Sequence, residues 1–295
     1  MLKKARAFFD ERGVMEVDVP LLSERASIDA HIDLIPALYG GSVPCTLHSS
    51  PEYGMKRLLA EGSGDIYQLS HVFRDGELGP KHNPEFMMAE WYRIGASFET
   101  MIEETLDFIR LFLGPLGAKR MTYKEMFLHY LKLDIEKASF EELASFPSLP
   151  LYEGIEDEGK DGVLTLLLST FIEPQLGQGE LFVLTHYPAS QAALAKTLPD
   201  KTAERFEVYF QGIELANGYH ELVDSDEQER RFHQANRERQ KLGKSPLPID
   251  TYFLKALAKG LPPCCGVAVG FDRLMMLRQE AKELANVIPF AFFEA

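Results

Sequence analysis

The chain has 295 residues, of which 45% are hydrophobic and 26% charged, a composition typical of a globular protein with a sizeable core. With 31 Lys and Arg against 45 Asp and Glu, its formal net charge is −14. This acidity argues against a broad non-specific nucleic-acid surface, which needs clustered positive charge. The longest basic stretch, Arg237 to Lys244, alternates with polar residues and predicts a solvated helix face rather than an RNA contact.

Three cysteines, Cys45, Cys264 and Cys265, stand without CxxC or Cys/His ligand spacing. Neither a zinc site nor a disulfide framework is therefore implied, and a reducing compartment fits. The N-terminus lacks the apolar run of a signal peptide, and no stretch approaches about 18 apolar residues. We expect a soluble, cytoplasmic protein without membrane contact.

The N-terminal residues 1–12 have the periodicity of a helix. Apolar and acidic side chains then alternate over Val14–Val19, which predicts a half-buried strand ended by Pro20. Met15, Val17 and Val19 are expected to share one face of that strand.

The next unit begins with a short predicted strand, Cys45–His48. Ser49 to Glu52 has capping-box spacing before a helix over Tyr53–Glu61. Two strands, Ile66–Arg74 and Glu85–Arg93, follow and flank the loop Asp75–Pro84. This arrangement predicts an antiparallel hairpin whose long tip suits a functional loop.

Residues 98–146 are helical in pattern, and strands and helices then segregate along the chain instead of alternating. This order favours an α+β fold, an antiparallel β-sheet flanked by helices, as a single domain over 1–295. The predicted helices are 101–113, 123–133, Ser225–Leu242 and one opened by Asp272; the predicted strands are Leu181–Thr185, Glu207–Phe210 and Cys265–Val269.

The hairpin carries the most informative side chains. Phe86, Met88, Glu90 and Tyr92 alternate along its second strand and so share a face. An aromatic ring can stack on a base, whereas a carboxylate and a phenol can hold an ammonium group. Arg74 ends the first strand, and its guanidinium can bind phosphate oxygens in pairs. The alternative is a structural hairpin with Phe86 and Met88 in the core and Glu90 at an exposed edge.

A second cluster begins at Glu207, and Gly212, where the strand is expected to bend or bulge, separates it from Glu214. Two carboxylates satisfy the protein ligands that magnesium usually takes beside substrate phosphates. Asn217, Tyr219 and Glu221 also alternate and share a face if the strand continues. A solvated acidic edge strand is the alternative. The sequence HELVD after this strand lacks the second histidine of a zinc helix motif, so zinc is dismissed.

A third cluster is a strand of small residues, Cys265–Val269, that runs into a helix with Arg273 in its first turn. Small side chains let a ligand lie against the backbone, and an arginine there can meet a polyphosphate. A surface ion pair is the alternative role for Arg273.

In this order, the clusters resemble the class II aminoacyl-tRNA synthetases. Residues of about 6–20 resemble motif 1, about 70–93 motif 2 and about 265–278 motif 3. The sequences HNPEF…EWY and ELANGYHEL are similar to the lysyl branch. The resemblance implies the catalytic fold of that class and a homodimer built through motif 1.

The sequences ELANGYHELVD, SPEYGMKRLLAEG and GVAVGFDRL more closely resemble the elongation factor P lysine ligases. Motif 1 begins almost at residue 1, so we expect no N-terminal anticodon-binding OB-fold domain. Ala268 stands where lysyl-tRNA synthetases usually have glycine. Our hypothesis is that its methyl group favours a β-amino acid over an α-amino acid, because a filled pocket rejects the wrong shape.

The resemblance also implies ATP and Mg²⁺ as cofactors and gives the nucleotide residues their roles. Arg74 would bind the α-phosphate and Arg273 the far phosphates. Phe86 would stack on adenine, with His82 and Asn83 supporting the nucleotide. Glu207 and Glu214 would hold magnesium, and Glu207 would also belong to the ATP site.

The substrate lysine or (R)-β-lysine would be recognised at both of its amino groups. By resemblance, Glu221 and Tyr92 take the side-chain ammonium, and Glu52 and Glu90 the other amino group. Glu52 has a rival role as the capping-box residue of its helix. Asn217 would take the carboxylate, with Tyr219 and Ala268 also lining the substrate site.

One position departs from the family. Motif 2 usually reads Arg-x-Glu, but here the third residue is Gly76 and the glutamate comes next, at Glu77. Either Glu77 substitutes through a small loop shift, or that contact is absent.

The implied reaction activates the amino acid as an adenylate and passes it to a lysine ε-amine of elongation factor P, with tRNA an unlikely acceptor. Three alternatives stay open: a minimal synthetase that acylates tRNA, a non-catalytic amino-acid-binding paralogue, and an amide-forming enzyme such as an asparagine synthetase. The phosphate-binding residues argue against the silent paralogue, and Glu221 and Tyr92 argue against an aspartate substrate.

Overall fold

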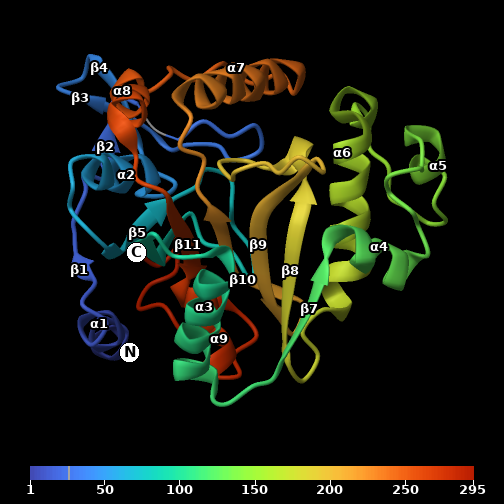
Figure 1. Cartoon of the computed structure of the whole chain (residues 1–295), viewed down its shortest axis with the longest axis horizontal. Helices are drawn as coiled ribbons and strands as arrows, with labels where there is room; N and C mark the ends of the chain where they lie inside the picture. The colour runs from blue at the N-terminus through green and yellow to red at the C-terminus, as the bar shows by residue number, and fades with distance from the viewer. Residues whose placement is uncertain (26) are drawn as a thin grey trace. The chain divides into compact units, whose positions relative to one another are not determined.

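The computed structural model describes residues 1–25 and 27–295, which form two compact units (Figure 1). The first unit comprises 1–114 and 221–295, and the second comprises 115–220. The three motifs predicted from the sequence all belong to the first unit. Each unit is described by itself.

The sheet of the first unit is built on the predicted hairpin. Strands β5 (Ile66–Phe73) and β6 (Glu85–Ile94) pair antiparallel, and β11 (Cys264–Gly270) pairs antiparallel with the other side of β6. The short β1 (Met15–Glu16) adds to β5 in parallel. The prediction of an antiparallel hairpin with a long tip is confirmed.

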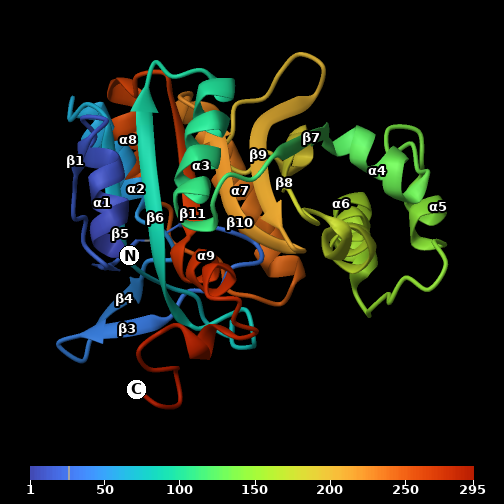
Figure 2. The same ribbon diagram turned by 90° about the horizontal axis from the view of Figure 1, so that it is seen from below.

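One face of this sheet packs on an aromatic core. Helices α1 (Leu2–Asp10), α3 (Phe98–Leu113) and α9 (Phe271–Arg278) supply it, and Figure 2 shows α3 and α9 along β6 and β11. Phe9 of α1 stacks on Tyr67 with ring centroids 4.2 Å apart. Apolar burial of this extent is the main stabilising contribution to the unit.

Three further helices of the first unit, α2 (Glu52–Ala60), α7 (Ser225–Lys241) and α8 (Thr251–Gly260), pack on one another. Tyr53 of α2 stacks on Phe253 of α8 at 4.4 Å. Asp224 caps the N-terminus of α7 by accepting two backbone N–H bonds. That helix confirms the prediction over Ser225–Leu242, because capping and the dipole both favour acids at its start.

The alternation of side chains along β6 creates two environments. Trp91 is fully buried and contacts the aromatic core, whereas Glu90 and Tyr92 point to the opposite face. On β11 the residues that face them are Ala268, opposite Glu90, and Gly266, opposite Tyr92. Small residues on β11 therefore leave room over the polar side chains of β6.

The N-terminal strand differs from its prediction. Only Met15–Glu16 is strand, although Val17 still donates a backbone bond to Tyr67. Met15 is 49% exposed while Val19 is buried, so the expected common buried face is wrong for Met15. Among the described residues, β1 pairs with β5 alone and forms an edge of its sheet.

A small sheet of the first unit contains β2 (Leu22–Ser23), β4 (Val43–Leu47) and β3 (Pro36–Tyr39), in that order and antiparallel. The strand predicted at Cys45–His48 lies within and just after β4.

The second unit contains strands β7 (Ala118–Thr122), β8 (Leu181–Pro188), β9 (Thr202–Phe210) and β10 (Ile213–His220). Strands β8, β9 and β10 pair antiparallel, but β7 pairs with β8 in parallel. The predicted antiparallel sheet is confirmed for β5–β6, β6–β11, β8–β9 and β9–β10, whereas the pairs β1–β5 and β7–β8 are parallel. The fold class is α+β, with a mixed sheet in place of the antiparallel one.

Strand β7 lies inside the stretch 98–146 that the sequence pattern predicts as helical. Five residues are too few to carry a periodicity of their own, and pairing with the distant β8 decides their conformation. The helices around it are α4 (Tyr123–Leu131), α5 (Phe140–Ala144) and α6 (Ile155–Leu167), which share an apolar core with the strands (Figure 1).

The remaining helical elements are short: η1 (Leu168–Ile172), η2 (Glu173–Gln175), η3 (Ala189–Gln191) and η4 (Leu284–Asn286). Across the described part of the chain, no helix combines the length and the apolar character needed to cross a membrane.

Candidate active site

Arg74 directly follows β5, and its backbone N–H bonds to the carbonyl of Pro84 across the hairpin. Its guanidinium lies 5.1 Å from the centroid of the Phe86 ring and 3.6 Å from Oε1 of Glu77. Its buried Nε has no hydrogen-bond partner among the described residues. Because an unpaired buried donor is costly, this nitrogen is suited to an incoming anion. The shift of the motif 2 glutamate to Glu77 thus still brings a carboxylate to Arg74.

Arg273 reaches the hairpin loop from the first turn of α9. Its Nη2 donates to Nε2 of His82 at 2.7 Å, and its Nε donates to the carbonyl of Lys81 at 3.2 Å. Burial, and then the charge of Arg273, lower the pKa of His82, so the neutral ring accepts this bond. The structure therefore brings Arg273 and His82 together, as the predicted nucleotide site requires.

Asn83 is buried, and its amide is engaged within the chain. Its Nδ2 donates to the carbonyl of Glu85 at 2.6 Å, and its Oδ1 accepts from the N–H of Phe292 at 3.1 Å. These bonds shape the end of the loop and fix the C-terminal segment on it.

The second feature of this unit is a cluster of buried acids around one lysine. Lys56, on α2, is fully buried; its Nζ lies 2.6 Å from Oε1 of Glu52 and 2.5 Å from Oε2 of Glu221. Glu90 lies in the same cluster: its Oε1 accepts from the hydroxyl of Tyr92 at 2.7 Å and its Oε2 from Ser50 at 2.8 Å. The structure thus assembles all four first-unit residues predicted to bind the two amino groups.

The electrostatics of this cluster favour a cationic ligand. Burial, and then the Glu52 carboxylate, raise the pKa of Glu90 to about 7. Burial likewise raises the pKa of Glu221, against the opposing charge of Lys56. Oε1 of Glu221 has no hydrogen-bond partner among the residues described. A ligand ammonium would relieve both the carboxylate repulsion and the missing bond.

The rival role of Glu52 as a capping-box residue is wrong. Helix α2 begins at Glu52 after Pro51 and has no side-chain cap bond. Instead, the Glu52 N–H donates to Ser50 Oγ at 3.0 Å, and the Glu52 carboxylate turns to Lys56 one helical turn later. Because Glu52 is the first residue of α2 and not its third, and Ser50 in place of Ser49 accepts its N–H, the reciprocal bonds of a capping box do not form.

Strand β11 closes the cluster. A Cβ atom at Gly266 would lie 2.3 Å from Cε1 of Tyr92 and 2.5 Å from Oε1 of Glu221, far inside contact distance. Ala268 stands two residues on, opposite Glu90, and is partly exposed. The predicted position of Ala268 beside the substrate residues is therefore consistent with the register.

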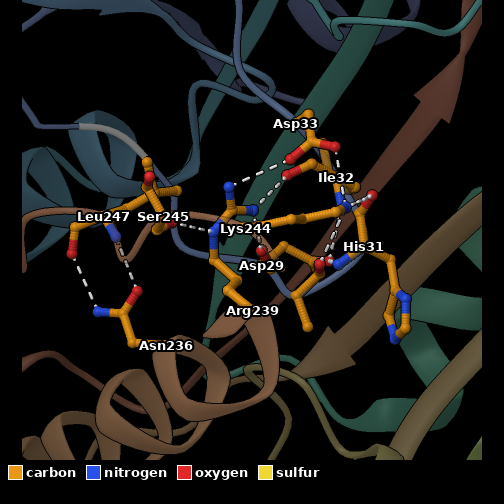
Figure 3. Close-up of polar contacts among 10 residues, drawn as sticks. Asp29, His31, Ile32, Asp33, Asn236, Arg239, Lys244, Ser245 and Leu247 are labelled. Carbon is orange, nitrogen blue, oxygen red and sulfur yellow. Dashed lines mark hydrogen bonds and ion pairs between the residues drawn. The ribbon is translucent and has the colours of Figure 1, made fainter. Parts of the chain in front are cut away.

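A polar network fixes the loop that precedes β3 to helix α7 (Figure 3). Arg239 is only 5% exposed; it donates to the carbonyls of Asp29, Ile32 and Ser245 and to Oδ1 of Asp33. Lys244 pairs with the other oxygen of Asp33 at 2.8 Å.

This network corrects the prediction of a solvated basic helix face over 237–244. Arg237 is exposed, but Arg239 and Lys244 hold backbone carbonyls. Although burial opposes it, the bonds and charges of Lys244 and Arg239 lower the pKa of Asp33. The carbonyl of Asp33 in turn accepts from the N–H of Asp75, the residue after Arg74, so the network supports the start of the hairpin loop.

In the second unit, Glu207 lies on β9 with buried partners. Its Oε1 accepts from Arg205 at 2.6 Å, and its Oε2 accepts from the hydroxyls of Tyr187 and Tyr209. A carboxylate oxygen offers two acceptor positions, so one position remains on Oε1. The donor set of Glu207 therefore fits a single bond to a cation such as Mg²⁺.

The strand pairing brings further predicted residues to the face of Glu207. Asn217 stands opposite Glu207, Glu214 opposite Tyr209, and Tyr219 opposite Arg205. The buried Oδ1 of Asn217 has no hydrogen-bond partner within the described residues. Among those residues no group of three or more His, Cys, Asp or Glu side chains could hold a metal, so substrate phosphates would have to complete a magnesium site.

The predicted bend at Gly212 is instead a hairpin turn. Gly212 has a φ of +68° between β9 and β10, which places Glu207 and Glu214 on separate strands. The irregularity of the ladder lies between Glu214 and Ala216. Glycine is favoured in the turn because side chains rarely adopt positive φ.

The whole chain matches one protein family. Residues 1–294 match the family described as tRNA synthetases class II (D, K and N). The chain belongs to this family. Among curated proteins, this class II synthetase is 43% identical to an elongation factor P--(R)-beta-lysine ligase of Yersinia enterocolitica, over 98% of this chain and 92% of the relative. It is 44% identical to the protein of the same name from Histophilus somni, over 97% of this chain and 90% of the relative.

Two features of this cluster are not predicted from the sequence: the pairing of Lys56 with both Glu52 and Glu221, and the close approach of Gly266 to Tyr92. Lys56 follows Glu52 by four residues on a predicted helix, so the ion pair between them could be predicted from this spacing. Its second partner, Glu221, could not, because it lies far along the sequence. Gly266 falls within the predicted motif 3, but its close approach to Tyr92 and Glu221 depends on the fold.

Proposed function

We propose that this class II synthetase activates lysine or (R)-β-lysine with ATP and transfers the lysyl group to a lysine ε-amine of elongation factor P. The observation that carries the proposal is the buried acid cluster of Glu52, Glu90 and Glu221, beside the hairpin that bears Arg74. Two ammonium groups on one substrate suit several buried carboxylates. The names of the relatives support this substrate and this acceptor.

In the first step, an oxygen of the amino acid carboxylate bonds to the α-phosphorus of ATP while the bond from that phosphorus to the bridging oxygen breaks. Pyrophosphate leaves, and an aminoacyl-adenylate remains. Arg74 binds the α-phosphate and stabilises the charge that develops there. Arg273, with His82, holds the far phosphates, and Phe86 stacks on adenine.

Magnesium, when bound, neutralises phosphate charge during this step. Glu207 and Glu214 would hold it together with the phosphates. The remaining acceptor position on Glu207 and the shared strand face of the two carboxylates support this role.

The amino acid is held at both ends. Glu221 and Tyr92 take the side-chain ammonium, and Glu52 and Glu90 the second amino group. Asn217 takes the carboxylate, with Tyr219 beside it on β10. In the second step, the nitrogen of the acceptor lysine bonds to the acyl carbon, AMP leaves, and the amine proton passes to solvent.

We infer that the protein is a homodimer through motif 1. The exposure of Met15 and of Leu2, two apolar side chains within or beside that motif, supports a covered surface there. Light scattering on purified protein tests this, and a monomeric mass at micromolar concentration would contradict it.

The experiment that tests the reaction is the intact mass of purified elongation factor P after incubation with this protein, ATP, Mg²⁺ and (R)-β-lysine. We expect one lysyl-sized increase on the factor and no charging of tRNA in a parallel reaction. Charged tRNA with unmodified factor would make the protein a minimal tRNA synthetase. No product on either, together with retained lysine binding, would support a binding paralogue instead.

A further inference from the structure

Lys56 is the one cation of the described residues that pairs with the acid cluster. Its side chain is fully buried, with Nζ bound between Glu52 and Glu221. The ring centroids of Tyr92 and Phe253 each lie 6.0 Å from Nζ. Titratable groups face it from its own helix (Glu52), from β6 (Glu90 and Tyr92), from β11 (Cys264) and from Glu221.

A lysine in this position is held charged by its neighbours. Burial alone would lower the pKa of Lys56, but the carboxylates of Glu221 and Glu52 raise it above its usual value. Each ion pair uses one named oxygen: Oε1 of Glu52 and Oε2 of Glu221. The ammonium therefore fixes the orientation of both carboxylates.

The orientation it imposes leaves an acceptor for a ligand. With Oε2 of Glu221 on Lys56, its Oε1 points toward Gly266 and the Tyr92 ring and lacks a hydrogen-bond partner among the described residues. Glu221 is only 2% exposed, so water does not readily satisfy this oxygen. A buried acceptor without a donor indicates a place for a donor group of the substrate.

Lys56 also sets the charge of the cluster. Three carboxylates and one ammonium give it a formal charge of −2 when all are ionised. A diamino acid brings two ammonium groups and matches that charge. Without Lys56, the pKa values of Glu90 and Glu221 would rise further, because the ammonium whose charge lowers both would be gone.

We propose that Lys56 is a positioning residue that aligns Glu52 and Glu221 for the two ammonium groups of a diamino acid and so selects such substrates over monoamino acids. This proposal rests on the proposed function of the cluster as the amino acid site. Lys56 itself need not touch the substrate, because its effect passes through the two carboxylates.

The test compares the wild-type protein with Lys56→Met, which keeps length and removes charge, and Lys56→Arg, which keeps the charge. Calorimetric binding of lysine and of norleucine is measured over a range of pH, because binding needs no turnover. We expect Lys56→Met to weaken lysine binding about tenfold or more at neutral pH, since the substrate ammonium loses a correctly ionised partner. Norleucine, which lacks the side-chain ammonium and keeps only the amino group assigned to Glu52 and Glu90, should lose less affinity than lysine, and ATP binding should change little.

The pH dependence separates positioning from folding. In Lys56→Met the pKa values of Glu90 and Glu221 rise further, because the Lys56 charge that lowers both is lost. Lysine binding should therefore recover toward alkaline pH, with its midpoint above that of the wild type. Lys56→Arg should regain part of the affinity and the wild-type midpoint. A variant that merely misfolds would not recover with pH, and Lys56→Arg then carries the comparison alone.

Unchanged lysine affinity and midpoint in folded Lys56→Met would overturn the proposal. So would a Lys56→Arg protein that folds but binds lysine and norleucine with equal affinity. Failure of the proposed function has a different signature, because then the wild-type protein itself would not bind lysine.

Discussion

Gly266 and Tyr92 face each other across β11 and β6 at a distance that only a glycine permits. A Cβ atom at residue 266 would lie 2.3 Å from the Tyr92 ring, closer than side chains approach one another in folded proteins. The same atom would lie 2.5 Å from Oε1 of Glu221. The absence of a side chain at residue 266 therefore determines where the Tyr92 ring and the Glu221 carboxylate stand.

Gly266→Ala should displace Tyr92 and Glu221 and weaken lysine binding, while ATP binding remains. Overpacking of this kind typically costs about 1–3 kcal/mol of stability. The measurement is lysine and ATP affinity beside the thermal midpoint. Gly117→Ala is the matched control, because the nearest atom to its new Cβ is a side-chain oxygen at 3.6 Å. Wild-type lysine affinity in Gly266→Ala would contradict the packing argument.

Arg74→Ala should abolish adenylate formation while the fold remains. Loss of one group that stabilises developing charge typically reduces turnover by about 10²–10³. Lysine-dependent exchange between ATP and pyrophosphate measures the step directly. Arg74→Lys is the control: it keeps a charge but loses the paired geometry, so it should recover only part of the rate. Near-normal exchange in Arg74→Ala would remove Arg74 from the reaction.

Arg239→Ala should destabilise the first unit, because its guanidinium satisfies three backbone carbonyls and Asp33 in a buried position. Leaving such groups unpaired costs about 3 kcal/mol. Arg237→Ala, two residues away and exposed, should stay within about 0.5 kcal/mol of the wild type. Chemical denaturation of both variants decides the matter, and equal midpoints would show that the network in Figure 3 adds no stability.

The contrast between Arg237 and Arg239 also shows what the sequence can and cannot reveal. The alternation in β6 predicts that Phe86, Glu90 and Tyr92 share a face, because the pleat depends only on local geometry. Burial of Arg239 depends on a loop some two hundred residues earlier in the chain. The charge pattern of residues 237–244 carries no information about that loop, and it therefore predicts a solvated face.

The same limit applies to the site. The residues of the hairpin, and the roles assigned to them, follow from motifs that are contiguous in sequence. Lys56 joins Glu52 to Glu221 through a contact between α2 and the start of the final segment, which only the fold creates. The parallel pairing of β7 with β8 was missed for the same reason.

Glu90 should make stability depend on pH in a predictable direction. Its pKa rises to about 7 in the folded protein, so between its ordinary value and about 7 the folded state holds a proton that the unfolded state has lost. Stability from this group is therefore full at low pH and falls as pH rises through that window. Glu90→Gln, which stays neutral, should lose this dependence.

Thermal unfolding of the wild type and Glu90→Gln over about pH 5 to 8 measures the effect. As pH rises, the thermal midpoint of Glu90→Gln should increase relative to that of the wild type. Saturating lysine should reduce the difference between the two thermal midpoints. The lysine ammonium stabilises the ionised Glu90 carboxylate and so offsets the cost of burying its charge. A constant difference between the two proteins across this range would mean that Glu90 is ionised throughout.

Ala268 faces Glu90 across β11 and β6. Its methyl group adds bulk without charge beside the proposed amino acid site. Ala268→Gly should therefore move preference from (R)-β-lysine toward lysine. A single methyl group distinguishes ligands by about 1–3 kcal/mol, so the ratio of kcat/KM values should shift by about tenfold or more. The ratio is measured by adenylate formation with each amino acid. Ala268→Ser, which retains the bulk, is the control and should keep the wild-type order. If Ala268→Gly leaves the ratio unchanged, the preference must arise from the spacing of Glu52, Glu90 and Glu221 instead.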